Sequence, residues 1–297
     1  MEILSLSQKQ FKKLKKLPLP KGVVNTESEI YILDNKKFNS KEKLLLKKLT
    51  VIGESYISNK IYNVSLLGDN KDRIGIDELV IPNYLVSIDG KVESFAVPKI
   101  EGRNLGSIIN NPKISNEKKL YYLYKVGKLI KKTQKLEDKG IKFNFGDLHE
   151  DNFMVGKKDD KAYAIDLDGS YLKSSYPQPS KYLIENPNLG LFPTKYISTG
   201  TGLIVPNDNS DLLCYNMMIL NTIGKDEVSE IEIAVYSEYI SYLKTLGFGS
   251  DIIESFNRVY STADNINPCE YLDQIPNDKI GEAGVKVFEY KKSKGKL

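Results

Sequence analysis

The chain has 297 residues, of which 40% are hydrophobic and 28% are charged, a balance that is typical of a globular protein with a sizeable buried core. Its 43 basic residues nearly balance its 39 acidic residues, so the net charge of +4 gives no reason to expect a nucleic acid partner. The longest nearly apolar run, residues 212–220, is too short to cross a bilayer, and the first residues lack the apolar core of a signal peptide. We therefore expect a cytoplasmic protein with no membrane partner.

Histidine and cysteine are scarce, which excludes several classes of site. His149 is the only histidine, so a zinc site with several histidines is excluded, and any catalytic triad would have to use this one imidazole. The cysteines, Cys214 and Cys269, lie in apolar surroundings without a partner at metal-ligand spacing. They predict buried thiols in a reducing compartment rather than a disulfide.

The first part of the chain resembles β-structure. Residues 9–16 mix lysines with a few apolar residues, and we interpret them as a solvated N-terminal extension. Residues 29–33 are β-branched and aromatic, and the turn signal Asp34-Asn35 predicts a hairpin with residues 36–38.

A helix and a second hairpin are expected next. Ser40 is positioned to cap a helix with Glu42 in its first turn and an apolar stripe of leucines. Residues 79–88 and 92–97 flank Asp89-Gly90, a dipeptide that supplies the positive φ of a tight hairpin turn. The leucines of the expected stripe are Leu44, Leu45 and Leu49.

After Pro98 the apolar residues recur at helical spacing. Ser115 predicts the start of a long helix that ends near Gly140, and residues 169–206 are interpreted as a long ordered loop. Further helices are expected at residues 211–223, capped by Asn209-Ser210-Asp211, at 228–246 and at 251–260, followed by a frayed basic tail at 291–296. The fold class is thus α+β, with a β-rich lobe at 1–100, a helical lobe at 101–297 and a cleft between them.

One segment carries most of the candidate catalytic and metal-binding residues. Two short apolar runs, 153–155 and 162–165, are separated by a charged turn and predict an antiparallel ribbon. Asp147 and Asn152 stand at its entrance and Asp166 at its exit, so the ribbon should bring their oxygens together. Such hard oxygen ligands suit Mg²⁺, which takes its other ligands from water and phosphates. Alternatively, these side chains only hydrogen-bond their own backbone.

These residues give the chain a resemblance to the protein-kinase-like superfamily. Protein kinases carry His-Arg-Asp-Leu-Lys-x-x-Asn followed by Asp-Phe-Gly, and the aminoglycoside and choline phosphotransferase branch carries His-Gly-Asp-Leu-His-x-x-Asn followed by Ile-Asp. Here Gly146-Asp147-Leu148-His149 precedes Asn152, and Asp166 stands fourteen residues after Asn152. The resemblance implies a two-lobed fold with a small antiparallel β lobe containing one helix, ATP and Mg²⁺ as cofactors, and phosphoryl transfer to a hydroxyl.

The resemblance also implies roles for individual residues. Asp147 would orient the acceptor hydroxyl and take its proton, and His149 would lie near the transferred phosphoryl group. Asn152 and Asp166 would hold the magnesium. Asp168, which replaces the glycine of Asp-Phe-Gly, would bind the metal directly or contact one of its ligands.

Further residues are assigned by their place in the pattern. Residues 97–102, including Glu101, fall where the family's hinge meets adenine, and Asp211 falls where an aspartate supports the catalytic loop. The strand lysine that grips the phosphates would be Lys36 or Lys37, with Glu42 as its helix partner, although a surface lysine and a helix-start glutamate remain open as alternatives. The small lobe lacks the family's glycine-rich loop.

The leading interpretation is an ATP-dependent kinase acting on Ser or Thr of a protein. The long loop before Asp211 favours a protein acceptor, whereas Gly146, His149 and Asp168 favour a small hydroxylated molecule. A pseudokinase that binds nucleotide without turnover is the alternative from another class, and transfer of AMP instead of the phosphoryl group is a further one.

Overall fold

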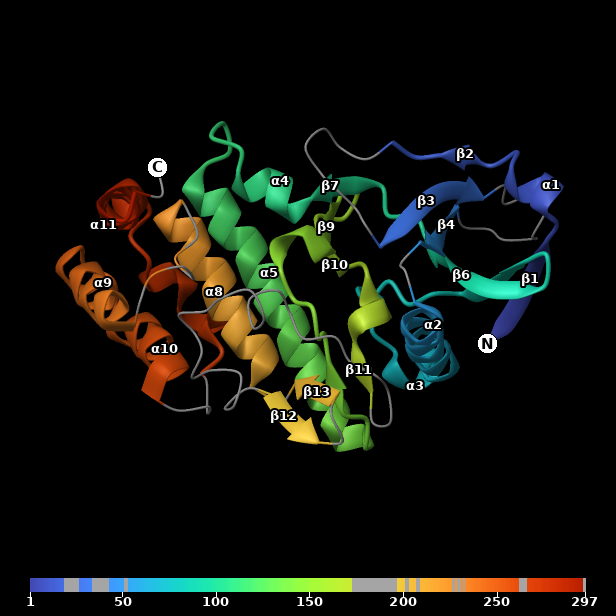
Figure 1. Cartoon of the computed structure of the whole chain (residues 1–297). Helices are drawn as coiled ribbons and strands as arrows, with labels where there is room; N and C mark the ends of the chain where they lie inside the picture. Colours follow the sequence, from blue (N-terminus) through green and yellow to red (C-terminus); the bar gives the residue numbers. More distant parts are fainter. Residues whose placement is uncertain are drawn as a thin grey trace.

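The N-terminal part of the chain forms a mixed six-stranded sheet (Figure 1). The computed structural model describes residues 1–18, 27–33, 43–50, 53–172, 197–200, 203–206, 209–225, 228, 231, 233–261 and 266–295. The strands are β1 (Glu2–Leu6), β2 (Lys15–Lys16), β3 (Ser28–Leu33), β4 (Leu44–Leu49), β5 (Tyr84–Ile88) and β6 (Lys91–Pro98), in the order β1-β5-β6-β4-β3-β2. Because β1 runs parallel to β5 while the other neighbours are antiparallel, the expectation of a purely antiparallel sheet is wrong.

The lysines of residues 9–16 are exposed, as predicted for a solvated extension, but parts of the N-terminal segment belong to the sheet. Its first strand and its second strand occupy opposite edges of the sheet, and the short helix α1 (Gln8–Phe11) lies between them in sequence. Ser7 caps α1, since its hydroxyl accepts a hydrogen bond from the Gln10 amide. Phe11 is buried, and its ring meets that of Tyr31 edge to face, with the ring centres 4.8 Å apart.

The expected helix at residues 40–49 is also wrong, because residues 44–49 form strand β4. The strand pairs with β3 on one side and with β6 on the other, so it is central in the sheet. Leu44 and Leu46 are fully buried on one of its faces, and Leu49 is buried on the other. The expected hairpin partner at 36–38 lies outside the described residues.

The second hairpin is confirmed. Strands β5 and β6 pair in antiparallel fashion, and both turn residues have positive φ, 48° at Asp89 and 85° at Gly90. That conformation is the one that a two-residue hairpin turn requires. Gly90 supplies it without the steric cost that a side chain would add.

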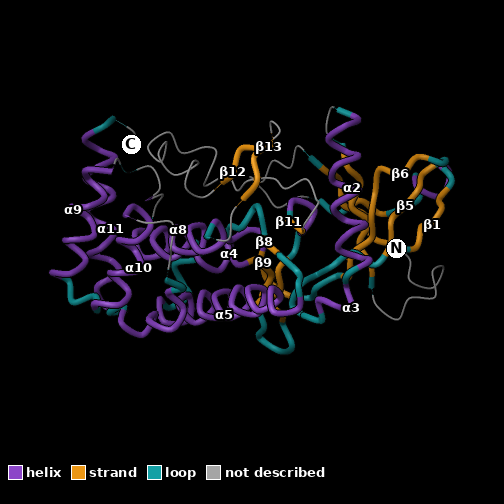
Figure 2. The backbone as a smooth tube through the Cα atoms, turned by 90° about the horizontal axis from the view of Figure 1, so that it is seen from below, coloured by secondary structure: helices purple, strands orange, loops and turns teal. Residues whose placement is uncertain are grey.

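A helix that the sequence pattern did not predict covers one face of the sheet. This helix, α2 (Glu54–Asp69), is followed by the single turn α3 (Lys71–Ile74). Val64 of α2 packs with Leu85 and Phe95 of the sheet in one cluster. Figure 2 shows the strands of the N-terminal sheet gathered at one end of the molecule with α2 alongside them.

From Gly102 onward the chain is mainly helical, as expected. The helices are α4 (Leu105–Ile109), α5 (Asn116–Gln134), α8 (Ser210–Gly224), α9 (Ile233–Thr245), α10 (Ser250–Ser261) and α11 (Ile280–Ser293), with short 3₁₀ turns at Lys135–Lys139, Glu150–Asn152, Leu167–Gly169, Pro268–Gln274 and Asn277–Lys279. The strands are β7 (Gly102–Asn104), β8 (Phe143–Asn144), β9 (Phe153–Gly156), β10 (Ala162–Ala164), β11 (Tyr171–Leu172), β12 (Ile197–Gly200) and β13 (Leu203–Pro206). One continuous apolar core joins α5 and α8 to the ribbon strands β9 and β10.

Most helix predictions for this part are confirmed. Ser115 caps α5 through its side chain, and Gly140 ends the following 3₁₀ turn with a φ of 70°. The helices predicted at 211–223 and 251–260 correspond to α8 and α10, and α9 begins later than expected. Residues 291–293 belong to α11, so the expected frayed tail there is wrong.

Several broader expectations have different outcomes. The two cysteines are free and buried, as predicted. The expected loop at 169–206 contains β11, β12 and β13, and residues 173–196 lie outside the described part. The described helices include none with both the length and the apolarity needed to span a bilayer. The division into lobes at residue 100 stays a prediction.

The burial of Phe11 gives a test of the N-terminal segment. We expect Phe11→Ala to lower the free energy of unfolding by about 3 kcal/mol, because the truncation leaves a cavity against Tyr31. Urea unfolding with an unchanged m value would measure the loss. The control is Ile3→Ala on β1, where the side chain is 51% exposed and the change should stay within about 0.5 kcal/mol. Equal effects of the two substitutions would contradict the assignment of Phe11 to the core.

Candidate functional site

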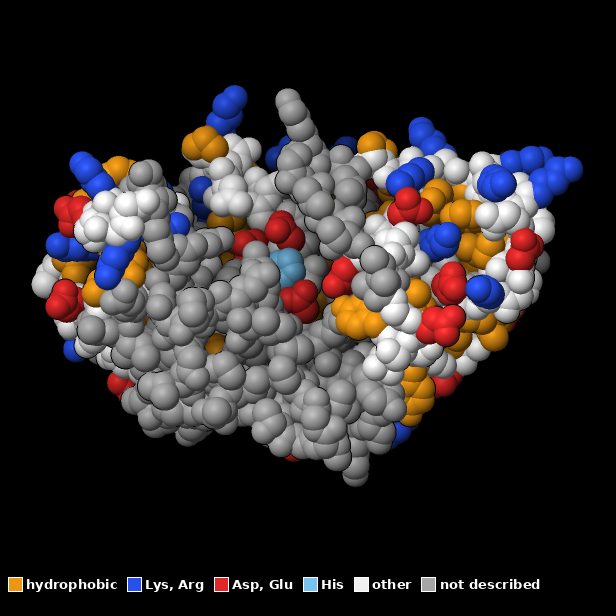
Figure 3. All heavy atoms as spheres, in the orientation of Figure 1, with side chains coloured by type: hydrophobic (Ala, Val, Ile, Leu, Met, Phe, Trp, Pro, Cys, Tyr) orange, Lys and Arg blue, Asp and Glu red, His pale blue; other side chains and the backbone are white. Residues whose placement is uncertain are grey.

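The site is built on the β9–β10 ribbon, which forms as predicted. Ala162 pairs with Val155 and Ala164 with Phe153 in antiparallel register. At the open end, the Ile165 amide donates to the Asn152 carbonyl at 2.8 Å, so the entrance and the exit of the ribbon are tied together. Figure 3 shows the one histidine of the chain in a hollow of the surface, with acidic side chains around it.

The backbone that leads into Asp147 is fixed by hydrogen bonds to a buried carboxylate. Both oxygens of Asp211, at the start of α8, accept a hydrogen bond from the Phe145 amide at 3.1 Å. Gly146 then adopts a φ of 72°, which a residue with a side chain rarely adopts, and the Asp147 amide donates to the Phe145 carbonyl at 2.9 Å. Asp211 therefore fixes the backbone at Phe145, two residues before Asp147.

Asp147, His149 and Asn152 are brought together within this loop. Asn152 Nδ2 donates to the Asp147 carbonyl at 2.8 Å, and the Asn152 amide donates to the His149 carbonyl at 3.1 Å. His149 Nε2 lies 3.5 Å from Asp147 Oδ2. The Asp147 side chain is 37% exposed, so its carboxylate is accessible to solvent.

Asp166 follows the ribbon in a left-handed backbone conformation, with φ 59° and ψ 54°. Few residues other than glycine adopt this conformation, and those that do are concentrated at active sites and ligand-binding sites. The Asp166 side chain is 38% exposed and forms an ion pair with Lys47 of β4. Burial acts to raise the pKa of Asp166, but the charges of Lys47 and Lys60 outweigh it and lower that pKa.

Asp168 is in a different environment, because its side chain is only 4% exposed. Lys47 Nζ lies 3.1 Å from its Oδ2, and Lys60 Nζ of α2 lies 3.4 Å from both of its oxygens. Burial and the adjacent charge of Asp166 raise the pKa of Asp168 despite these two lysines. The carboxylate is therefore an internal counter-ion for two ammonium groups.

Sequence reasoning missed both lysines of this network. Lys36, Lys37 and Glu42, predicted to contact the cofactor, lie outside the described residues, so their roles stay predictions. Lys47 comes from a strand that was expected to be a helix. A strand pattern for residues 44–49 would have placed Lys47 on the same face as Leu49, in the middle of an apolar run, and this is the signal that could have identified it.

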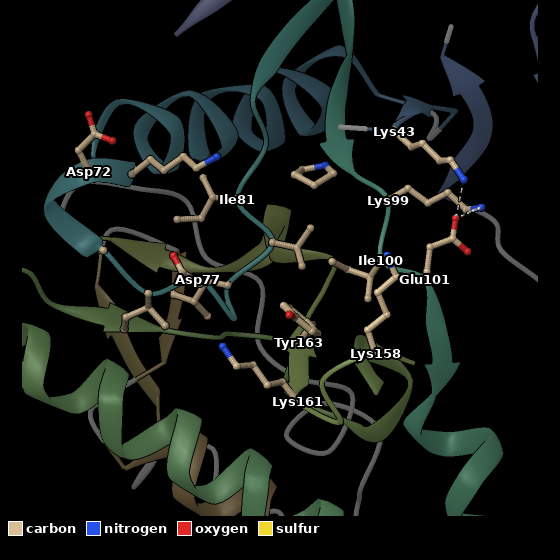
Figure 4. Close-up of a pocket in the computed structure, with 16 residues that line it drawn as sticks. Lys43, Asp72, Asp77, Ile81, Lys99, Ile100, Glu101, Lys158, Lys161 and Tyr163 are labelled. Atoms are coloured by element: carbon tan, nitrogen blue, oxygen red, sulfur yellow. Dashed lines mark hydrogen bonds and ion pairs between the residues drawn. The ribbon is translucent and has the colours of Figure 1, made fainter. Parts of the chain in front are cut away.

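Glu101 lies apart from these carboxylates, beside a cavity of about 840 Å³ (Figure 4). Its side chain pairs with Lys99 at 3.1 Å and with Lys43 at 3.2 Å, and these two lysines lower its pKa. The cavity is lined by residues of the segments 71–81, 98–101 and 158–163 and by Lys43, and not by Asp147 or Asp166. The predicted role of Glu101 in cofactor binding stays a prediction.

Two residues near the open end of the ribbon carry oxygen atoms of the kind that a hard cation prefers. Within the described ranges, no group of three or more His, Cys, Asp or Glu side chains is arranged to hold a metal. Asp166 offers an exposed carboxylate, and Asn152 offers Oδ1, since its Nδ2 is engaged with Asp147. Two protein oxygens completed by phosphate and water oxygens are the usual ligand set for Mg²⁺ beside a nucleotide.

Neither protein-family models nor curated protein sequences gave a match to this chain. The resemblance to the kinase-like superfamily therefore stays a prediction from the sequence motifs.

The buried charges give a stability test. We expect Lys60→Met to lower the free energy of unfolding by about 3 kcal/mol, because it removes one of the two cations that compensate buried Asp168. Lys128→Met on α5 is a matched control, since Lys128 is 46% exposed and pairs with Glu270 at 3.5 Å on the surface. Urea unfolding of both variants would measure the difference. Similar, small losses would show that Lys60 does not compensate Asp168.

Proposed function

We propose that this protein is an ATP-dependent phosphotransferase that acts on a hydroxyl group. The observation that carries the proposal is the arrangement at the open end of the ribbon. Asp147 and Asn152 lie on one side of it, Asp166 lies on the other, and a lysine from the central strand of the sheet reaches Asp166. A general base, two metal-binding oxygens and a phosphate-binding cation are the parts that phosphoryl transfer requires.

Asp147 is the proposed base. Its exposed carboxylate could accept a hydrogen bond from the acceptor hydroxyl, orient the oxygen for attack and take its proton. The bonds from Asn152 to the Asp147 carbonyl and from Asp211 to the preceding loop fix its backbone, which limits the positions that the carboxylate can reach. His149 beside it would bring a ring nitrogen close to the group that is transferred.

Asn152 and Asp166 are the proposed metal ligands, and Lys47 is the proposed phosphate ligand. Magnesium, when bound, would neutralise negative charge on the phosphates. Lys47 is the cation of β4 that lies nearest to this position, because its ammonium group already contacts Asp166. Catalysis would then consist of positioning and electrostatic stabilisation, without a covalent intermediate on the protein.

The acceptor is proposed at the level of a hydroxyl compound. Ser or Thr of a protein was favoured by the length of residues 169–206, and much of this segment lies outside the described part. The small-molecule alternative is favoured by His149, whose ring nitrogen lies 3.5 Å from the proposed base and would offer a second polar group to a compact acceptor.

A second candidate is nucleotide binding without turnover. It is favoured by the pairing of both Asp166 and Asp168 with lysines, because a carboxylate engaged with an ammonium group is a weaker metal ligand. A thermal-shift assay separates the two candidates: stabilisation by ATP only together with Mg²⁺ supports the enzyme, and stabilisation by ATP alone supports the binding protein.

The enzyme proposal predicts loss of transfer in two variants. Asp147→Asn removes the base and Asp166→Asn weakens the metal site, and each should lower transfer from labelled ATP by about a thousandfold. Asp138→Asn, an exposed carboxylate on the 3₁₀ turn after α5, is the control and should keep full activity. The acceptors offered would be the protein itself, a mixture of Ser- and Thr-containing peptides, and aminoglycosides or choline.

Mass spectrometry of the products distinguishes the remaining alternatives. The mass gained by the acceptor tells a phosphoryl group from AMP, and gain by the protein itself would identify a protein hydroxyl as an acceptor. Transfer that persists unchanged in Asp147→Asn and Asp166→Asn would remove the assignment of these residues.

A further inference from the structure

The two carboxylates that follow the ribbon differ sharply in exposure. The Asp166 side chain is 38% exposed and the Asp168 side chain 4%, although only one residue separates them. Lys47 contacts both carboxylates, so its ammonium group lies between an open oxygen and a buried one.

We propose that Asp168 is the anchor of Lys47 and not a metal ligand, and that Lys47 competes with a divalent cation for Asp166. This inference rests on the proposed function, since it assigns the cation to Asp166 and Asn152. Asp168 is then a positioning residue that acts through Lys47.

The surroundings of Asp168 are built from helix α2. Lys60 lies 3.4 Å from both Asp168 oxygens, and Asn63, one turn further along α2, donates from Nδ2 to the Asp168 carbonyl at 3.2 Å. Lys60 is in turn held by Glu27 at 2.7 Å. Both the side chain and the backbone of Asp168 are thus fixed by one helix.

A cation at Asp168 would be unfavourable for electrostatic reasons. Any ion bound to its carboxylate would lie close to the ammonium groups of Lys47 and Lys60, which are 10% and 4% exposed and so are poorly screened by water. Only one of these lysines, Lys47, forms an ion pair with Asp166, and the Asp166 carboxylate faces solvent. Asp166 is therefore the better ligand of the two.

Helix α2 also explains why an aspartate after the ribbon would hold the lysine. In the kinase-like pattern a glutamate on a helix pairs with the strand lysine, but the acidic residues of α2 are Glu54 at its first position and Asp69 at its last. Its middle instead contributes Lys60. Asp168 supplies the negative charge that such a glutamate would provide, and Lys60 and Glu27 complete an alternating network of charges.

The competition at Asp166 follows from this geometry. Lys47 occupies one oxygen of Asp166, so a divalent cation on that carboxylate would be repelled by the adjacent ammonium group. Nucleotide phosphates would attract Lys47 and relieve the repulsion. Cation and nucleotide should therefore each strengthen the binding of the other, as linkage requires.

Binding of Mn²⁺ alone to the full chain tests the inference without requiring activity. We would follow the electron paramagnetic resonance signal of free Mn²⁺ during titration, with circular dichroism to check folding. Asp166→Asn should abolish binding, whereas Asp168→Asn should change the affinity by less than about threefold while weakening ATP binding about tenfold. Asp168→Asn combined with Lys60→Met removes one charge of each sign and serves if the single variant unfolds.

Lys47→Met tests the competition with the opposite sign of effect. Loss of the competing ammonium group should tighten Mn²⁺ binding by about tenfold without nucleotide and weaken ATP binding. Lys48→Met is the matched control, since Lys48 lies on the other face of β4 over the Phe11 ring, and it should change neither affinity.

Each contrary result has a distinct meaning. Equal loss of Mn²⁺ binding in Asp168→Asn and Asp166→Asn would overturn the anchor role, and unchanged Mn²⁺ binding in Lys47→Met would overturn the competition. Neither result would touch the transfer experiment with Asp147→Asn. Absence of Mn²⁺ binding to both the wild-type chain and Lys47→Met would overturn the inference together with the proposed metal site.

Discussion

The buried charge of Asp168 is the constraint on which the arrangement of the site depends. Removing a carboxylate from water is costly unless cations and hydrogen bonds replace the lost hydration. Here the replacement comes from Lys47 of the sheet and from Lys60 of α2. The side chain of Asp168 therefore links the segment after the ribbon to both the sheet and the helix that covers it.

The ion network around Asp168 is buried, whereas the carboxylates of Asp166 and Asp147 are partly exposed. A buried ion network is weak evidence for net stability, because well-packed apolar residues could fill the same space. It does restrict the orientation of its members, since each misplacement leaves a charge uncompensated. The Asp168 side chain is the least exposed of the three carboxylates, so the restricted part of the site lies inside, and Asp166 and Asp147 face solvent.

How much could be predicted from the sequence depends on how far apart the interacting residues are in the chain. The ribbon that joins Asn152 to Asp166 was predicted correctly, because it is a local hairpin whose ends meet irrespective of the rest of the fold. Lys47 lies 119 residues before Asp166, and only the assembled sheet brings it there. Helix α2 was missed because Gly53 gives no side-chain cap and because Lys60 and Asn63, polar residues on its buried side, interrupt its apolar pattern to serve Asp168.

Strand β4 shows why the leucine run was ambiguous and what decided its structure. Three consecutive leucines fit a buried helix or a buried strand equally well, and the choice was made by partners on both sides, β3 and β6. One face of β4 packs Leu44 and Leu46 against Leu6 and Phe11 of the N-terminal segment. The other face points Lys47 past Phe95 to the carboxylates, with Nζ 5.7 Å from the ring centre. The N-terminal segment thus stabilises the site indirectly. It packs against one face of β4 and so fixes the position of this strand, which carries Lys47 on its opposite face.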